Sequence, residues 1–256
     1  MHLTIVGSGY VGLVTGTCFS NTGNQVTCLD IDPERVATML RGECPIFEPG
    51  LSELMTLNIK AGRLHFTDDR ATGYAHGELI FICVGTPTGP DGRSDLSAVM
   101  AVARDIGHAI ESGDCTVEHP VIVVKSTVPV GTTSKVREVI ASITSKPFGV
   151  ADNPEFLREG DAIRDFQQPD RVVCGVHDQR SCKLLSKLYE PYVSQSNPLM
   201  FMDIESSEMV KYASNAMLAA KISFINEIAR LAEHYGADIA RVREGMCADK
   251  RIGDKF

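Results

Sequence analysis

Three glycines with the spacing G-x-G-x-x-G come directly after the first apolar run of the chain. They are Gly7, Gly9 and Gly12. A second apolar run, residues 25–29, leads into Asp30. In a strand–turn–helix–strand unit, such glycines allow a tight turn, a close approach of a pyrophosphate and close packing of the helix. An acid at the position of Asp30 binds ribose hydroxyls. Because the carboxylate would repel a 2′-phosphate, the pattern predicts NAD rather than NADP; the alternative is a glycine-rich turn without a ligand.

Polar residues also follow later apolar runs. Thr86 and Thr127 each lie shortly after such a run, and residues 153–160 (NPEFLREG) follow another. In an open parallel sheet, ligands bind beyond the carboxyl ends of the strands. We therefore expect these residues, the glycine turn and Asp30 to converge on one crevice. The alternative for each threonine is an ordinary turn residue whose hydroxyl bonds to the main chain.

Two carboxylates in the last of these segments are spaced for acid–base chemistry. Glu155 and Glu159 are four residues apart and would share one face of a helix. In a crevice, two such groups suit a general acid and a general base. The alternative is the solvated start of a helix, where acidic side chains are favourable.

A cation and an amide have the same spacing further along the chain. Lys211 and Asn215 lie one helical turn apart, and Glu208 lies one turn before Lys211. Over a crevice, the ammonium and the amide would stabilise negative charge on a substrate oxygen. The alternative is an exposed Glu208–Lys211 ion pair, which contributes roughly a few tenths of a kcal/mol.

These residues need a scaffold of strands and helices, and the apolar pattern predicts one. Residues 79–84 (LIFICV) and 121–124 (VIVV) are apolar throughout, as in strands buried on both faces of a parallel sheet. Their alternation with segments of helical spacing predicts an α/β fold with a doubly wound parallel Rossmann-type sheet. We expect strands at 3–6, 25–29, 79–84, 121–124, 148–151, 171–175 and 199–202, and helices near 95–110, 133–143 and 178–192.

The alternation stops at a long helical segment. Residues 204–235 contain neither Gly nor Pro and predict one long helix, capped by Asp203 or Ser206, before a second, shorter helix. We therefore expect a dinucleotide-binding domain over residues 1–203 and the start of a central helical region over residues 204–256. A stripe of Met and Ile on the long helix favours association, so we expect a homodimer through this helix.

Composition and charge disfavour several classes of protein. The chain has 256 residues, 43% of them hydrophobic, and its formal net charge of −8 argues against nucleic acid or an anionic membrane as a partner. No apolar stretch approaches the roughly 20 residues that span a bilayer, and the N-terminus predicts a core strand rather than a signal peptide. The eight cysteines form no C-x-x-C pair and the seven histidines show no metal-ligand spacing. We therefore expect reduced, buried thiols, no metal site and a cytoplasmic protein.

A series of motifs runs through the chain in order. The motifs are residues 7–12 (GSGYVG), 45–51 (PIFEPGL), 84–87 (VGTP), 125–131 (KSTVPVG), 153–160 (NPEFLREG) and 211–215 (KYASN). Along the whole chain, this series resembles the UDP-glucose/GDP-mannose dehydrogenase family. The resemblance implies NAD as the cofactor and a four-electron oxidation of a nucleotide sugar, with UDP-glucose in first place, from the C6 alcohol to the carboxylate. The alternatives are GDP-mannose or a UDP-N-acetylhexosamine as the substrate, or a non-catalytic NAD-binding subunit.

The resemblance also implies roles for individual residues. Thr127 would help to position the reacting water, and Glu155 would act as a general acid or base. Lys211 and Asn215 would stabilise oxyanions formed at C6. The residues that would contact the sugar nucleotide are Glu155, Phe156, Leu157, Lys211 and Asn215. The residues that would hold NAD are Gly7, Val11, Gly12, Asp30, Arg35, Thr86, Thr127 and Glu159.

One part of the family's chemistry has no counterpart in the sequence. The family's covalent step uses a cysteine in a glycine-rich segment that would follow shortly after residues 251–253, and none of the eight cysteines has that context. The family's second nucleotide-binding domain, which holds much of the UDP, has no counterpart either. Without a thiolate, the aldehyde cannot be trapped as a thiohemiacetal and oxidised again. We therefore expect these residues to bind NAD without forming a sugar acid.

Overall fold

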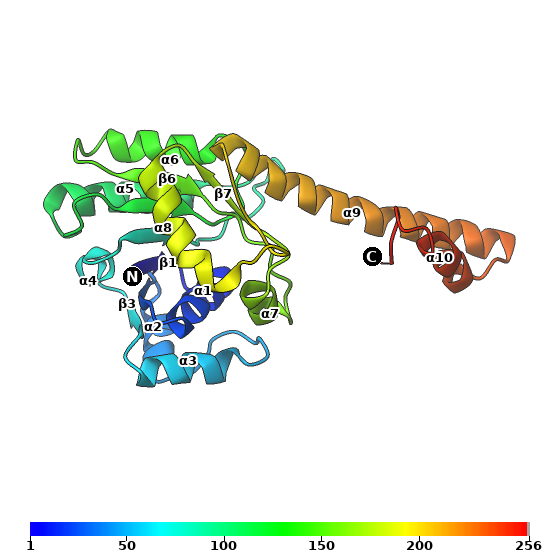
Figure 1. Cartoon of the computed structure of the whole chain (residues 1–256), viewed down its shortest axis with the longest axis horizontal. Helices are drawn as coiled ribbons and strands as arrows, with labels where there is room; N and C mark the ends of the chain where they lie inside the picture. Colours follow the sequence, from blue (N-terminus) through cyan, green and yellow to red (C-terminus); the bar gives the residue numbers. More distant parts are fainter. Residues whose placement is uncertain (255–256) are drawn as a thin grey trace. The chain divides into compact units, whose positions relative to one another are not determined.

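A computed structural model describes residues 1–254. An eight-stranded sheet forms the centre of the part before residue 210 (Figure 1). The strand order is β3-β2-β1-β4-β5-β6-β7-β8. Neighbouring strands are parallel except β6 and β7, which are antiparallel. The predicted α/β Rossmann-type sheet is confirmed, with one reversed pair that the apolar pattern did not reveal. The strands are β1 His2–Val6, β2 Gln25–Leu29, β3 Leu64–Thr67, β4 Leu79–Ile82, β5 Val121–Val124, β6 Gly149–Asp152, β7 Val172–Val176 and β8 Leu199–Met202.

The strand order contains one switch point. From β1 the chain moves outward through β2 to β3, and then returns to β4 on the other side of β1. Helices that follow β1 and β4 therefore lie on opposite faces of the sheet. In open α/β sheets, such a switch point leaves a ligand-binding crevice at the carboxyl ends of the two strands. This is the edge at which the predicted site residues are expected.

The helices differ from the predicted ones mainly at their ends. Helix α9 has the predicted bounds, whereas the region between residues 40 and 78 contains a strand and two helices that we did not predict. Asp side chains cap several helix starts, including α2, where Asp32 accepts hydrogen bonds from the N–H groups of Glu34 and Arg35. The helices are α1 Tyr10–Asn21, α2 Pro33–Leu40, α3 Leu51–Lys60, α4 Arg70–Tyr74, α5 Ser97–Ser112, α6 Thr132–Ala141, α7 Ala162–Gln167, α8 Gln179–Tyr189, the 3₁₀ turn η1 Glu190–Tyr192, α9 Ile204–Tyr235 and α10 Ile239–Cys247.

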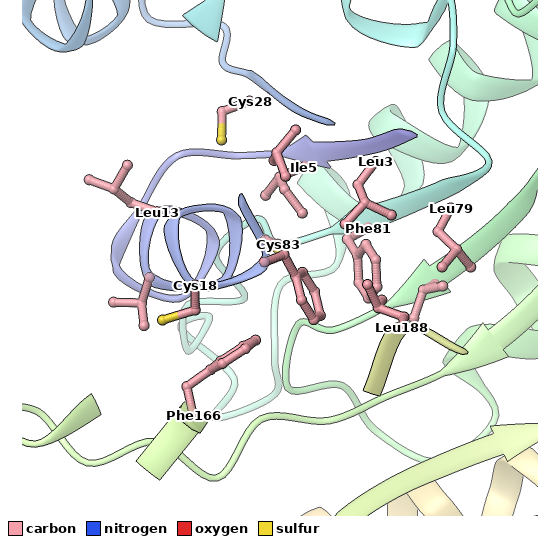
Figure 2. Packing of buried hydrophobic residues seen from close by; sticks show 14 of the residues in the cluster. Leu3, Ile5, Leu13, Cys18, Cys28, Leu79, Phe81, Cys83, Phe166 and Leu188 are labelled. Carbon is pink, nitrogen blue, oxygen red and sulfur yellow. The ribbon is translucent and has the colours of Figure 1, made fainter. Parts of the chain in front are cut away.

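Side chains of the central strands alternate between two buried clusters. On β4, Phe81 belongs to one cluster, which contains residues of α1, α3, α7 and α8, whereas Ile80 and Ile82 belong to the other, which contains residues of α4, α5 and α6. Figure 2 shows the first cluster, where Phe81 lies among side chains from other strands and helices. Because strand side chains alternate in direction, continuous apolar runs require helices on both faces of the sheet.

The chain falls into two compact units. The first comprises Met1–Met209, and the second begins at Val210, so helix α9 contains the boundary. Asp203 Oδ1 accepts a hydrogen bond from the N–H of Ser206 at 2.8 Å, so Asp203 rather than Ser206 is the cap of α9. Within residues 1–254, no helix combines the length and the apolar character that crossing a membrane requires. All eight cysteines are free thiols, and Cys28, Cys83 and Cys174 are buried as expected.

Candidate active site

The glycine turn between β1 and α1 has the geometry that its spacing predicts. Gly7 has φ +94°, and a Cβ there would lie 2.9 Å from the carbonyl oxygen of Cys83. A Cβ on Gly12 would lie 1.8 Å from the carbonyl oxygen of Gly7, so no other residue fits without moving the backbone. At Gly9, by contrast, a Cβ would have no atom within 4 Å, and this residue, at the N-cap position of α1, offers no side chain to the N–H groups of the helix start. The start of α1 is therefore open to a ligand.

Asp30 lies at the end of β2 beside this turn. Its carboxylate is buried, and Oδ2 accepts a hydrogen bond from the N–H of Ser8 at 2.6 Å. Oδ1 accepts from the N–H of Asp32 at 3.0 Å, and the Arg35 guanidinium lies 3.7 Å from Oδ2. Each carboxylate oxygen has a second lone pair, so Asp30 can hold the turn and still accept a ribose hydroxyl.

The two predicted threonines are joined by a hydrogen bond. Thr86, after β4, donates its hydroxyl to the carbonyl oxygen of Thr127, after β5, at 2.8 Å. Ser126 donates its hydroxyl to the carbonyl oxygen of Val84 at 2.6 Å. The loops that leave these two neighbouring strands are therefore fixed to each other at the carboxyl edge of the sheet.

The segment after β6 is not helical, so the expectation that Glu155 and Glu159 share a helix face is wrong. Pro154 disfavours helical geometry at the residue before it, and regular helix starts only at Ala162. The Glu155 carboxylate instead accepts a hydrogen bond from the N–H of Leu157 at 2.7 Å. Glu155 is half-buried and Glu159 is exposed, so the two carboxylates occupy different environments.

The next two residues of this segment have different neighbours. Phe156 stacks on an arginine, because the guanidinium carbon of Arg171 lies 3.9 Å from the centre of its ring. Leu157 is half-buried and packs against the cluster that contains Phe81. Arg171 directly precedes the reversed strand β7, and the sequence did not indicate its proximity to Phe156.

A buried polar cluster anchors the start of the segment. Asn153 is 1% exposed, and its Oδ1 accepts hydrogen bonds from the Lys125 ammonium at 3.2 Å and from the Tyr189 hydroxyl. Its Nδ2 donates to the carbonyl oxygen of Val173 at 2.8 Å. Burial raises the pKa of Tyr189 well above its usual range, so this hydroxyl stays protonated and can donate. Asn153 therefore links β5, β7 and α8.

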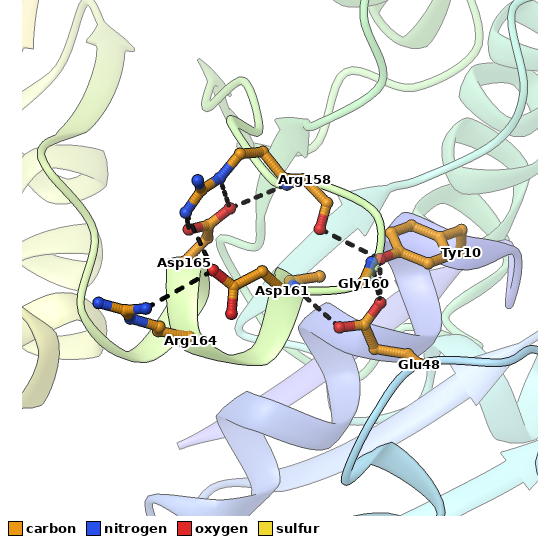
Figure 3. A network of polar contacts seen from close by, with 8 residues as sticks. Tyr10, Glu48, Arg158, Gly160, Asp161, Arg164 and Asp165 are labelled. Atoms are coloured by element: carbon orange, nitrogen blue, oxygen red, sulfur yellow. Dashed lines mark hydrogen bonds and ion pairs between the residues drawn. The ribbon is translucent and has the colours of Figure 1, made fainter. Parts of the chain in front are cut away.

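Glu48 anchors the other end of the same segment (Figure 3). Its Oε1 accepts a hydrogen bond from the N–H of Ala162 at 2.8 Å, and its Oε2 accepts from the N–H of Gly160 at 2.9 Å. The hydroxyl of Tyr10, the first residue of α1, also donates to Oε2. Sequence reasoning did not single out Glu48, although it is the one acid in the otherwise apolar motif of residues 45–51 (PIFEPGL).

Two acids fix the first turn of α9 to the sheet domain. Ser207 donates its hydroxyl to Asp152 Oδ2 at 2.6 Å, and burial raises the pKa of Asp152 to about 8. The carboxylate of Glu208 accepts hydrogen bonds from the N–H groups of Gly131 at 2.6 Å and Thr133 at 2.8 Å, at the start of α6. Glu208 is 1% exposed, so the alternative of an exposed Glu208–Lys211 ion pair is wrong; Glu208 caps another helix.

A surface cavity of about 490 Å³ lies apart from these residues. It is bordered by α4 and the second half of α5, with side chains such as Arg70, Tyr74 and Asp105. None of the predicted site residues contributes to it. The predicted site residues of the first unit lie at the carboxyl edge of the sheet rather than at this cavity.

Comparison with known proteins accounts for both units. The model of the UDP-glucose/GDP-mannose dehydrogenase family, NAD binding domain, matches residues 1–193. The chain belongs to this family. The model of the family's central domain matches residues 205–256.

Named members of the family are similar along the whole chain. The UDP-glucose 6-dehydrogenases of Rhizobium meliloti and Pseudomonas aeruginosa are 46% and 47% identical to it, over 100% of this chain and 58% and 56% of their own length. The solved UDP-glucose dehydrogenase of Pyrobaculum islandicum has a TM-score of 0.93 and 41% identity, covering 99% of this chain and 58% of that one. A GDP-mannose dehydrogenase of Pseudomonas aeruginosa has a TM-score of 0.92 and 37% identity, covering 97% and 57%. The chain thus spans little more than half of these dehydrogenases.

Membership in this dehydrogenase family gives the cofactor, NAD, because the matched domain is its NAD binding domain. The residues present fit this group. The uncapped start of α1 and the open space at Gly9 leave room for a pyrophosphate, and Asp30 lies beside the turn.

The predicted site residues of this family member separate into two groups. Those between residues 7 and 159 lie in the first unit, on loops and helix starts that follow strands β1, β2, β4, β5 and β6. Val11 and Arg35 are half-buried in the first turns of α1 and α2. Lys211 and Asn215 belong to the second unit, so their place over the crevice stays a prediction.

Proposed function

We propose that the chain forms the NAD-binding and sugar-orienting part of a UDP-glucose 6-dehydrogenase. One observation carries this proposal: candidate ligand-binding residues follow five parallel strands at one edge of the sheet. UDP-glucose 6-dehydrogenases with 46% and 47% identity support the choice of substrate. The residues concerned are Gly7, Gly9, Gly12, Asp30, Thr86, Thr127, Glu155, Phe156, Leu157 and Glu159.

In this proposal, residues of the chain orient the sugar and move its protons. NAD, when bound, accepts a hydride from C6. Glu155 takes the proton of the C6 hydroxyl, because it is a half-buried carboxylate on the segment that follows β6. Thr127 holds the water that supplies the second oxygen. Lys211 and Asn215 stabilise the negative charge that develops on the oxygen at C6.

Five of the eight cysteines are buried, which supports an incomplete reaction in this proposal. The family's second oxidation needs a thiolate, and burial raises the pKa of both Cys18 and Cys83 to about 12. Cys28, Cys115 and Cys174 are also buried, with their pKa raised by burial. We therefore propose that the chain binds NAD, and that it does not by itself convert UDP-glucose into UDP-glucuronate.

Calorimetric titration with NAD, in the presence and absence of UDP-glucose, tests this proposal. The expected result is saturable NAD binding, at least about tenfold weaker in Asp30→Ala because a buried hydrogen-bonding acid is lost. The same titration with GDP-mannose and UDP-N-acetylglucosamine compares the alternative substrates. GDP-mannose is included because a GDP-mannose dehydrogenase is 37% identical to the chain. No NAD binding by the folded chain would contradict the proposal. Rapid formation of UDP-glucuronate would contradict the proposed lack of turnover.

The second unit supports a proposed homodimer. Helix α9 carries large exposed apolar side chains, among them Met217, Ile222 and Phe224. Such a surface favours association with another copy. The measurement is the mass by light scattering, where a value of 27.8 kDa at micromolar concentration would contradict the dimer.

Two further assignments stay proposals. The first is a division into a dinucleotide-binding domain over residues 1–203 and a central helical region from residue 204. The second is a cytoplasmic location, which is supported by eight free thiols.

A further inference from the structure

Glu48 lies where two ligand-binding parts of the first unit meet. Tyr10, which donates to its carboxylate, directly follows Gly9 at the start of α1. Gly160, which also donates to it, directly follows Glu159. One buried carboxylate, 5% exposed, therefore contacts both the glycine turn's helix and the end of the segment that carries Glu155 (Figure 3).

The start of α7 depends on Glu48 because its own cap is engaged elsewhere. Asp161 occupies the cap position of α7 but makes no side-chain hydrogen bond to the helix. Its carboxylate instead lies 3.1 Å from Arg158 and 3.9 Å from Arg164. Glu48, which is 114 residues before Ala162, accepts the hydrogen bond from the first N–H of the helix.

The carboxylate of Glu48 is ionised in this environment. Burial on its own raises the pKa of Glu48, but the hydrogen bonds from Tyr10 and from the main-chain N–H groups of Gly160, Ala162 and Ile163 together lower it. Burial and the contact with Glu48 raise the pKa of Tyr10, so its hydroxyl keeps the proton that it donates. A neutral amide of the same size could not accept all of these hydrogen bonds.

Residues 153–158 form neither helix nor strand, so their place depends on side-chain contacts such as Phe156 on Arg171 and on what holds the two ends. Asn153 is fixed by the buried cluster with Lys125 and Tyr189. Gly160 is fixed by Glu48. If either end were released, fewer contacts would oppose a shift of the segment relative to the glycine turn, because a loop without regular hydrogen bonds has a low cost of local opening.

From this geometry we infer that Glu48 is a positioning residue for the reaction proposed above. It touches neither NAD nor the sugar, and it holds the segment of residues 153–160 at a fixed place relative to the start of α1. Through Tyr10 and Gly160 it fixes the position of Glu155, which takes the sugar's proton, relative to the groups that bind the cofactor. This inference rests on the proposed function for its ligands, and on the hydrogen bonds of Glu48 for its mechanism.

Three variants of the chain test the inference. Glu48→Gln keeps the volume but turns an N–H₂ group toward donors. Tyr10→Phe removes the hydroxyl that donates to Glu48 and that also lies 3.5 Å from the carbonyl oxygen of Arg158. Glu43→Gln is the control, since Glu43 is exposed and pairs with Arg41 at the surface. Each variant is titrated with NADH by fluorescence, and amide hydrogen exchange is followed by NMR over residues 155–163.

The expected results separate positioning from simple stability. Glu48→Gln should weaken NADH binding by about tenfold, the effect of one lost charged hydrogen bond, and speed exchange at Gly160 and Ala162 by a similar factor. Tyr10→Phe should speed exchange at Ala162, whose N–H donates to Glu48 Oε1. A variant that combines Tyr10→Phe with Glu48→Gln should add little to the effect of Glu48→Gln. Glu43→Gln should leave both measurements unchanged.

Two outcomes would overturn the inference. In one, Glu48→Gln lowers the melting temperature but binds NADH like the parent chain, which is what a purely structural cap would do. In the other, Tyr10→Phe leaves the exchange of Ala162 unchanged. If the parent chain itself binds no NADH, the proposed function fails, and the exchange measurements still decide whether Glu48 connects Tyr10 to the segment.

Discussion

The glycine turn and the segment of residues 153–160 both follow a parallel strand, but they are shaped in different ways. In the turn, the decisive contact joins Gly12 and Gly7, five residues apart, and a Cβ on Gly12 would lie 1.8 Å from the Gly7 carbonyl oxygen. In the segment, Gly160 is held by Glu48, which is 112 residues away in the chain. A turn that its own residues shape can be recognised in a sequence. A segment that distant residues hold can be recognised only as a motif.

The largest expected effect lies in the locally shaped region. Gly12→Ala places a methyl group against the Gly7 carbonyl, so we expect the free energy of unfolding to fall by about 3 kcal/mol or more, with loss of NADH binding. Gly9→Ala is the matched control, because its Cβ would have no atom within 4 Å. It should keep the stability and weaken NADH binding. Urea denaturation and NADH titration measure both, and a stable, NADH-binding Gly12→Ala would break the comparison.

A somewhat smaller effect is expected where the segment is anchored. Asn153→Ala removes hydrogen bonds to Lys125, Tyr189 and Val173 in a buried place. We expect the free energy of unfolding to fall by about 2–3 kcal/mol, since buried polar partners lose a neutral hydrogen-bonding group. Urea denaturation measures the change, with Asn21→Ala, at an exposed position, as the control. Equal effects of the two substitutions would show that residue 153 is not an anchor.

The pH dependence of stability gives a further test at Asp152, the residue before Asn153. Burial raises the pKa of Asp152 to about 8, although the hydrogen bond from Ser207 lowers it. In the unfolded chain this carboxyl loses its proton near pH 4, roughly its ordinary pKa. Unfolding therefore becomes easier as the pH rises from about 4 to about 8, and Asp152 contributes most to stability below this range.

Replacement by asparagine isolates this contribution. In Asp152→Asn, the decline of stability between pH 5 and pH 8 should be shallower than in the parent chain, because the group no longer titrates. Urea denaturation at several pH values gives the two slopes. Identical slopes would mean that Asp152 has an ordinary pKa in the folded protein.

The smallest effect is expected at the surface of the segment. Arg158 is paired with Asp165 at 2.6 Å, but its side chain is 65% exposed. We therefore expect Arg158→Ala to change the free energy of unfolding by less than about 1 kcal/mol. A thermal shift well above a few degrees would show that this pair, rather than Glu48, holds the segment.

The features that sequence reasoning found are those with a local cause. The glycine turn, the buried strands and helix α9 follow from spacing and apolar runs, and the structure has them where they were expected. The strand Leu64–Thr67 was not predicted, because four residues are too few for their alternation between apolar and polar side chains to be distinctive. Glu155 and Glu159 were wrongly placed on one helix face, because their spacing of four residues ignores Pro154. Glu48 and Glu208 were not recognised as caps, since each serves a helix far away in the sequence.

The reversed strand β7 changes where the ligand-binding edge of the sheet ends. Its last residues pair with the end of β6, with Gly175 opposite Asp152, so its first residues extend past the carboxyl end of β6. Arg171, directly before the first residue of β7, therefore contacts Phe156. A search confined to residues that follow strands would overlook it. Strand β8 runs the same way as β7, and its last residue Met202 lies beside Gly175. Helix α9 therefore begins level with the last residue of β6, where Ser207 donates a hydrogen bond to Asp152.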